Sequence, residues 1–382
     1  MSSPKRSFRS CRAAALFLCL LLGSGPLLAE HAAGQPVEQS LDIRVLHPPV
    51  PAVVDGRRSL LYELHVTSFA EEPLELKRVD AIDARTEQPV ASLIGRELIS
   101  AMSVVPSHDK VRQPVIEPGR RAIVYMSAVL QRQAGQAFLR HRLAFSRPGA
   151  APEMTVTGGP ARTEDETVLE LTPPLRGGPW TAVYDPQLPR GHRRFVYAVA
   201  GAAKIPGRFA IDWMPAPDSR GSWGGKRSAA DGIGAEVLAV ADARVVAVKD
   251  WYPDARKRET SGDLDTETGN MIVLDLGSGQ FASYQHLSPG LLVKKGDRVR
   301  RGQVIGRLGA SGSAVMPHLH FSVSADPAPL AGEGLPYRLT GARVVGSYDS
   351  FAGFMSRRAW RRNQPYQLDG LPAPNAVIMF GN

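Results

Sequence analysis

Short runs of alternating apolar and polar residues, separated by glycine and proline turns, make up most of the chain. In residues 62–67, an apolar side chain at every even position alternates with a polar one at every odd position. This period of two predicts a strand with one apolar and one polar face. A second such run, 121–126, follows the turn Glu117-Pro118-Gly119. Several short strands and few helical stretches over 36–147 predict a small β-sandwich of immunoglobulin-like type.

The pattern changes twice after this predicted sandwich. Residues 148–190 are rich in Pro, Gly and Thr, which predicts a linker or a wrapping segment. Short β runs then return between 191 and 325. Strands are expected at Phe195–Val199, Val237–Ala241, Val245–Val248, Met271–Leu276, Phe281–Gln285 and His318–Val323. The fold class is therefore predicted to be mainly β, with a second β domain over 191–325 and a C-terminal extension over 326–382.

The first 29 residues have the pattern of a secretory signal. Four basic residues between positions 5 and 12 precede an apolar stretch, and Leu27-Leu28-Ala29 offers a cleavage site. The apolar stretch is too short to span a bilayer comfortably, so no stable membrane span is expected after cleavage. Both cysteines, Cys11 and Cys19, lie in this segment. The mature chain would contain no disulfide or thiol ligand, which is typical of an exported bacterial envelope protein with a large core.

The charge balance adds little to this picture. The formal net charge is +9, and four of the basic residues lie in the predicted signal. The remaining bias suits contact with an anionic wall or membrane surface. No aromatic-flanked basic strand or zinc-finger spacing occurs, so nucleic acid is not an expected partner. The arginine pairs at 357–358 and 361–362 are interpreted as a solvated basic face.

Histidines near the C-terminus provide the candidate chemistry. His318 and His320 are two residues apart in a strand-like context, so both project from one face, about 7 Å apart. His286 ends another predicted strand, and Asp212 lies within a third strand-like stretch. A hydrolytic zinc site needs three protein ligands, usually His and a carboxylate, and one open position for water. These residue types therefore point to metal-assisted hydrolysis.

The same residues occur in a fixed order with several turn motifs. The series comprises Asp212, Val237-Leu238-Ala239-Val240-Ala241-Asp242, Tyr284-Gln285-His286-Leu287, Lys295-Gly296-Asp297, Gly302-Gln303 and Pro317-His318-Leu319-His320-Phe321. Over residues 200–325 it resembles the core of the lysostaphin/LytM-type peptidoglycan metallopeptidases. The resemblance implies an open antiparallel β domain with a groove, a zinc cofactor, and cleavage of peptide cross-bridges in bacterial cell wall.

The resemblance also implies roles for individual residues. Asp212 and His320 match two zinc ligands of the family. His286 and His318 match the imidazoles that activate water and stabilise the oxyanion. The family's remaining ligand is a histidine four residues before the aspartate, and that position here is Arg208. A guanidinium stays protonated and cannot coordinate zinc in the ordinary way, so this departure puts the metal site in question.

Two arrangements follow from this departure. On a regular strand Arg208 and Asp212 would face the same way, and their ion pair could occupy the place of the metal. Alternatively, Arg208 turns outward and zinc binds with extra waters or with a substitute ligand. His192 is the unassigned histidine nearby in sequence, and Asp218 and Asp231 are other donors.

Three functions remain open from the sequence. The first is a zinc endopeptidase that hydrolyses peptidoglycan stem peptides. The second is a catalytically inactive relative that binds the wall or activates another envelope hydrolase. The third is an envelope scaffold or adhesion protein whose sandwich domain carries the function. The first is preferred because three histidines and an aspartate converge in the predicted groove.

Overall fold

Strands are the main secondary structure of the described residues, as the sequence predicts. The computed structural model describes residues 40–105, 111–130, 137–150, 153–164, 169–184, 188, 191–216, 232–254, 264–314 and 316–381. Helices within these ranges are short, which confirms a mainly β fold. The predicted signal at 1–29 lies outside the described residues. Among the described helices, none has the length and apolar character needed to cross a membrane.

The N-terminal part forms two five-stranded antiparallel sheets. The first has the order β1-β3-β8-β6, with β2 also paired to β3, and the second has the order β10-β9-β4-β5, with β7 paired to β4. The elements are β1 (Leu41–Val45), β2 (Pro51–Val54), β3 (Arg57–Ser68), β4 (Leu74–Asp83), β5 (Pro89–Ile94), α1 (Gly95–Ser100), β6 (Met102–Val105), β7 (Val115–Ile116), β8 (Arg121–Val129), β9 (Phe138–Ser146) and β10 (Met154–Arg162).

One apolar core joins these two sheets into a sandwich. Leu60 and Leu64 of β3 belong to the same buried cluster as Val79 of β4 and Leu143 of β9. The alternation along β3 therefore has the predicted effect of sending one set of side chains inward. The immunoglobulin-like type of this sandwich stays a prediction.

The range predicted to be a linker contains strands. β10 pairs with β9 through residues 154–162, with a register shift between Gly158 and Ala161. A Cβ atom at Gly159 would lie 2.7 Å from a side-chain atom of Ile43, and Gly159 has a φ of 57°. Glycine is therefore required there by close packing and a left-handed backbone rather than by linker flexibility. Composition alone could not distinguish these two uses of glycine.

The C-terminal part is organised around one open ten-stranded sheet. Its order is β20-β17-β18-β19-β22-β15-β12-β26-β24-β25. Its strands are β12 (Trp180–Val183), β15 (Ile211–Pro215), β17 (Ala243–Lys249), β18 (Asn270–Gly277), β19 (Gln280–Leu287), β20 (Arg298–Val299), β22 (Leu319–Ser324), β24 (Ala342–Ser347), β25 (Arg361–Gln367) and β26 (Ala376–Phe380). Neighbouring strands run antiparallel throughout, which agrees with the predicted open antiparallel domain.

Smaller elements flank this sheet. They are β11 (Glu170–Leu171) paired with β23 (Arg338–Leu339), the hairpin of β13 (Tyr197–Val199) and β14 (Ala202–Lys204), and the pair of β16 (Glu236–Leu238) and β21 (Val304–Arg307). Short helices complete the chain: η1 (His192–Arg194), η2 (Pro206–Phe209), α2 (Leu264–Glu267) and α3 (Phe351–Met355). The 3-10 turn η1 begins at His192, and η2 ends three residues before Asp212.

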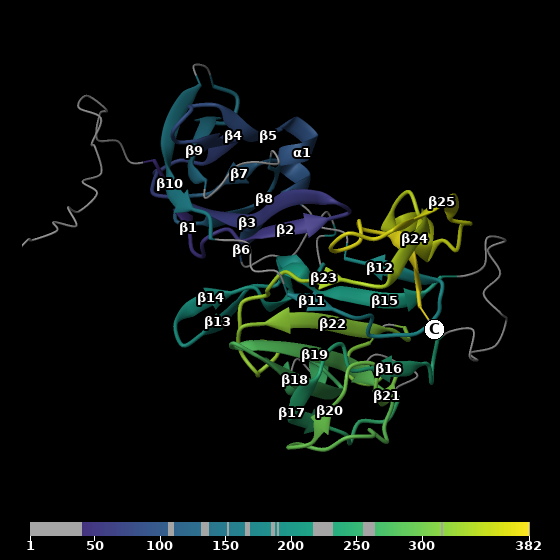
Figure 1. Cartoon of the computed structure of the whole chain (residues 1–382). Coiled ribbons are helices and arrows are strands. Elements are labelled where there is room, and N and C mark those ends of the chain that lie inside the picture. The colour runs from purple at the N-terminus through teal and green to yellow at the C-terminus, as the bar shows by residue number, and fades with distance from the viewer. Residues whose placement is uncertain are drawn as a thin grey trace, which may run out of the picture. The chain divides into compact units, whose positions relative to one another are not determined.

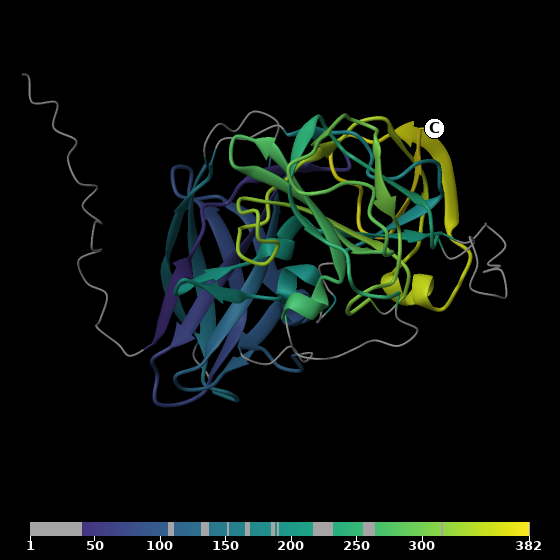
Figure 2. The same ribbon diagram turned by 90° about the horizontal axis from the view of Figure 1, so that it is seen from below.

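The segment predicted to be a C-terminal extension completes the large sheet. β26 pairs with β12 on one side and with β24 on the other. Trp213 of β15 packs edge to face on Phe380 of β26, with ring centroids 5.0 Å apart. Figures 1 and 2 show β24 to β26, coloured yellow, continuing the teal and green strands of this sheet.

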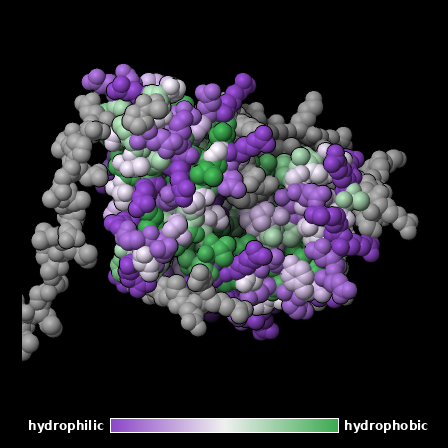
Figure 3. Space-filling view, turned by 90° about the horizontal axis from the view of Figure 1, so that it is seen from above, coloured by the Kyte–Doolittle hydropathy of each residue, from purple (hydrophilic) through white to green (hydrophobic). Residues whose placement is uncertain are grey.

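Residues 39–382 form one compact unit, and the sandwich touches the rest of it directly. Ala52 of β2 belongs to the core of the large sheet, and Leu371 N donates to Val53 O at 2.8 Å. The face shown in Figure 3 is mainly hydrophilic, with hydrophobic residues grouped in a few places between polar ones. Most large apolar side chains of the described ranges lie instead in the buried clusters.

Candidate metal centre

Strand pairing in the middle of the large sheet brings Asp212 and His320 together. Asp212 on β15 is the direct cross-strand partner of His320 on β22. Partners in an antiparallel pair project from the same face, so the two side chains meet. Nδ1 of His320 lies 2.9 Å from Oδ1 of Asp212. The register of the sheet thus brings together two residues that are 108 positions apart in the sequence.

His318 joins this pair from the start of β22. Because it lies two residues before His320, its side chain projects to the same side of the chain. Its Nε2 lies 3.4 Å from Oδ1 of Asp212, and its Nδ1 lies 2.7 Å from the carbonyl oxygen of Met316. That carbonyl can only accept, so Nδ1 carries the hydrogen in this arrangement.

His286 reaches the site through a bulge at the end of β19. Tyr284 pairs with Phe321 on the core side of the sheet, whereas Gln285 pairs with His320 on the site side. Regular alternation would return His286 to the core side. Instead the register with β18 shifts here, and His286 has a φ of 63°. The left-handed residue turns the imidazole to the site, as bulges beside active sites do.

The re-aimed His286 ring lies close to both other histidines. Its centroid is 4.6 Å from that of His318 and 6.1 Å from that of His320. Nδ1 of His286 lies 3.0 Å from the carbonyl oxygen of Ser311, which fixes the hydrogen on that nitrogen. Nε2 of His286 is consequently the atom that can accept a proton in the site.

His192 completes the cluster from outside the sheet. It begins the turn η1, and its Nε2 lies 3.0 Å from Oδ2 of Asp212. Its ring meets that of His320 edge to face at 4.7 Å. Gly207 of η2 lets the two turns approach, because a Cβ atom there would lie 2.7 Å from the carbonyl oxygen of His192. The substitute ligand considered from sequence therefore lies beside Asp212.

Burial and mutual charge set the protonation of the cluster. Burial alone would raise the pKa of the Asp212 carboxyl, but His192 and His318 hold that pKa well below its usual range. Burial and the neighbouring imidazoles lower the pKa of His286 well below its usual value. Burial lowers the pKa of His320 as well, against the pull of Asp212. Burial opposes a charge on His192, but Asp212 raises the pKa of that imidazole above its usual value. The carboxylate is therefore ionised, and zinc binding would release any proton held on His192.

The donor atoms of His192, Asp212 and His320 fit a zinc ion. One donor from each lies within 4.8 Å of the other two. Ligands at about 2.1 Å in tetrahedral geometry are roughly 3.4 Å from one another. The distances of 2.9 Å and 3.0 Å from Asp212 to the two imidazoles are close to that value. Two imidazoles and one carboxylate are also the donor types of hydrolytic zinc sites.

Arg208 does not occupy the place of the metal. Its guanidinium donates to Oε2 of Glu63 at 2.7 Å and lies 2.6 Å from Oε2 of Glu333. The predicted ion pair between Arg208 and Asp212 is therefore wrong. The physical reason is local, because Arg208 lies in the 3-10 turn η2 and not on a regular strand. The other arrangement considered, with Arg208 turned away from Asp212, is the observed one. Asp218 and Asp231 lie outside the described residues.

Sequence reasoning missed the two carboxylates that hold Arg208. Glu63 alternates with apolar neighbours on β3, and this pattern predicts a solvent-facing polar side chain. In the structure Glu63 is 4% exposed, because its face of the sandwich is covered. The only sequence signal for these carboxylates was Arg208 itself, because a buried arginine requires a carboxylate partner.

Comparisons with known proteins bear on the C-terminal part of the chain. Residues 223–331 match the model of Peptidase family M23, so the C-terminal part of the chain contains a domain of this family. That range includes His286, His318 and His320, and begins after Asp212. The resemblance predicted from the motifs is thereby confirmed.

Two curated relatives come from Vibrio cholerae serotype O1. Peptidoglycan DD-endopeptidase ShyB is 38% identical over 91 residues, which are 24% of this chain and 18% of the relative. Peptidoglycan DD-endopeptidase ShyA is 46% identical over 55 residues, 14% of this chain and 13% of the relative. The matches thus span less than a fifth of either relative.

One solved structure is similar over more of the chain. A zinc containing peptidase from Vibrio cholerae is 15% identical, with 78% of this chain and 87% of that chain covered at a TM-score of 0.24. At so low a TM-score this likeness supports no conclusion about function.

Proposed function

We propose that the protein is an exported, zinc-dependent endopeptidase that hydrolyses peptide cross-links of peptidoglycan. The observation that carries the proposal is the convergence of His192, Asp212 and His320 within 4.8 Å. Two further imidazoles, His286 and His318, lie beside this donor set. The matched peptidase family and the named activity of the two curated relatives support the substrate class.

His192, Asp212 and His320 would hold the zinc ion. Bound there, zinc supplies a Lewis acid for the scissile carbonyl and lowers the pKa of a coordinated water. Three protein ligands leave the open position that a hydrolytic site needs. The carboxylate of Asp212 lies between the two imidazole ligands, since Oδ1 faces His320 and Oδ2 faces His192.

His286 and His318 would move the protons of the reaction. The Nδ1 atom of each faces a backbone carbonyl oxygen, so Nε2 is the exchangeable position. The lowered pKa of His286 keeps its ring neutral and able to accept a proton. His318 lies closer to Asp212 and suits stabilisation of the negative oxygen or protonation of the leaving amine.

The proposed location is the periplasm or cell envelope of a bacterium. The basic and apolar pattern of residues 1–29 supports export. The proposed partners are peptidoglycan stem peptides, a substrate class supported by the matched peptidase family and by the named activity of the two curated relatives. Other envelope hydrolases are secondary candidates for partners.

Zinc content and cleavage test this proposal on the same samples. The purified chain, freed of loosely bound metal, is expected to retain about one zinc per molecule and to release peptide fragments from purified peptidoglycan. His320→Ala removes a ligand, so both zinc and cleavage should be lost. His65→Gln is the matched control, because Nδ1 of His65 is buried without a hydrogen-bond partner among the described residues.

Each outcome decides between the remaining functions. A wild-type chain that takes up no zinc in excess metal would end the metallopeptidase proposal. Zinc binding without any cleavage of peptidoglycan would favour a catalytically inactive protein that binds the wall or activates another hydrolase. Cleavage that survives loss of His320 would place the chemistry elsewhere in the chain.

A further inference from the structure

We infer that Glu63, on β3 of the sandwich, is a positioning residue for the metal ligand His192. The inference rests on the proposed zinc site. Under this inference the sandwich helps to hold a metal ligand in place, although the two are distant in sequence. Glu63 would act through Arg193, the residue that directly follows His192 in η1.

The side chains of the turn η1 face both the large sheet and the sandwich. His192 faces Asp212, whereas Arg193 faces the sandwich. Nε of Arg193 donates to Oε1 of Glu63 at 2.7 Å. One terminal nitrogen donates to the carbonyl oxygens of Tyr62 and Met126 at 2.7 Å and 2.8 Å. This set of bonds fixes the backbone next to His192 against β3 and β8.

Arg194 adds a second attachment to the same sandwich. Its guanidinium donates to the carbonyl oxygen of Ser100 at 2.5 Å and to Oγ of Ser103 at 3.1 Å. Its charge lies 4.1 Å from the ring centroid of Tyr125, a distance suited to a cation–π contact. Arg193 and Arg194 are 6% and 3% exposed, so both contacts are shielded from water.

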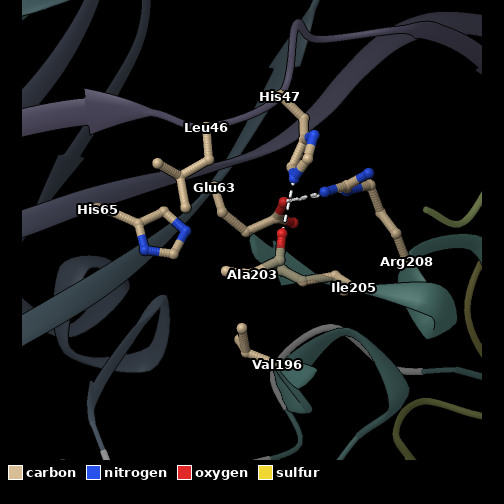
Figure 4. Close-up of a pocket in the computed structure, with 8 residues that line it drawn as sticks. All are labelled: Leu46, His47, Glu63, His65, Val196, Ala203, Ile205 and Arg208. Atoms are coloured by element: carbon tan, nitrogen blue, oxygen red, sulfur yellow. Dashed lines mark hydrogen bonds and ion pairs between the residues drawn. The ribbon is translucent and has the colours of Figure 1, made fainter. Parts of the chain in front are cut away.

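Glu63 joins the turn η1, which carries His192, to the turn η2, which precedes β15. Its Oε1 accepts from Arg193 of η1, and its Oε2 accepts from Arg208 of η2. Figure 4 shows the Glu63 carboxylate and the Arg208 guanidinium in direct contact at the wall of a small pocket, with His47 beside them. That pocket holds about 10 Å³, room for about one water. The position that carries a zinc ligand in the family thus carries here a group that anchors Glu63.

These contacts make the turn η1 rigid. A three-residue 3-10 turn has few hydrogen bonds of its own and takes its position from its surroundings. A metal ligand must be held within about 0.5 Å of its working position. A buried carboxylate between two arginines can do this, because separating any pair would leave an unpaired buried charge.

Zinc affinity of the full-length Glu63→Gln variant tests the inference. Competition with a chelator is expected to show about tenfold weaker zinc binding, at the low end of losses for groups that orient ligands. The visible spectrum of the cobalt-substituted variant should change as well, since displacement of His192 alters the coordination of the metal. Asp80→Asn is the matched control: Asp80 is buried in the other sandwich sheet and pairs with Arg78.

Arg193→Lys provides a second variant if Glu63→Gln does not fold. It keeps the positive charge but cannot form the same fork of hydrogen bonds, so weaker zinc binding is again expected. The inference is overturned if the folded variants bind zinc as tightly as Asp80→Asn and give the wild-type cobalt spectrum. A wild-type chain without zinc would instead overturn the proposed function together with this inference.

Discussion

Nε2 of His192 lies 3.0 Å from Oδ2 of Asp212, although the matching family ligand would come from position 208. The two positions lie on neighbouring 3-10 turns that touch through Gly207. His192 on η1 therefore contacts the carboxylate of Asp212. In the family pattern this carboxylate would have a histidine at position 208 beside it. The donor types of the site are preserved, while the place in the chain that supplies one of them has changed.

His192→Ala should abolish the stabilisation of the fold by zinc. Zinc at about a hundred times its dissociation constant raises the free energy of unfolding by about 2.7 kcal/mol. The variant keeps Asp212 and His320 but lacks the third ligand, so added zinc should leave its thermal unfolding nearly unchanged. Differential scanning calorimetry with and without a chelator measures this. An equal zinc-induced shift in wild type and variant would exclude His192 as a ligand.

His286→Ala should separate metal binding from catalysis. The ring contacts His318 and His320 but is not among the three proposed ligands. Loss of a general base costs about 10²- to 10⁴-fold in rate. We expect kcat for peptidoglycan cleavage to fall by at least about 100-fold with zinc content unchanged. Loss of zinc in this variant would show instead that His286 helps to hold the metal.

Glu63 should make the fold sensitive to acid. Burial would raise the pKa of Glu63, but Arg208 and Arg193 lower it from 4.5 to about 2. A lowered pKa contributes stability that is complete above pH 4.5 and is lost as the pH falls toward 2. At about 1.36 kcal/mol per unit, the loss is about 3 kcal/mol.

Urea unfolding at a series of pH values checks this dependence on Glu63. The difference in unfolding free energy between wild type and Glu63→Gln should shrink as the pH falls through that window. A difference that stays constant from pH 6 to pH 2 would mean that the carboxylate is not paired in solution.

Arg208→His should restore the family pattern in sequence without improving the metal site. Arg208 is paired with Glu63 and Glu333, and removal of one partner from a buried ion pair costs about 3 kcal/mol. The new imidazole would face these carboxylates rather than Asp212. We expect lower stability by chemical denaturation and no gain in zinc affinity. A marked gain in affinity would show that position 208 can still reach the metal.

The sequence by itself determined the mainly β fold and most of the candidate site. Alternation with a period of two depends only on neighbouring residues, so strands such as β19 and β22 could be predicted locally. The motif around His318 and His320 identified the peptidase family for the same reason. Spacing also placed Asp212 in a strand, although its partner His320 is set by the register of the sheet.

Only the tertiary structure decided how the departure at Arg208 is accommodated. Whether a charge is tolerated depends on partners distant in sequence, and Glu63 lies 145 residues away from Arg208. The bulge that turns His286 to the site is likewise a property of two paired strands. His192 reaches Asp212 because η1 is fixed to the sandwich by long-range contacts. Local pattern sets which elements form, whereas burial and register set which side chains meet.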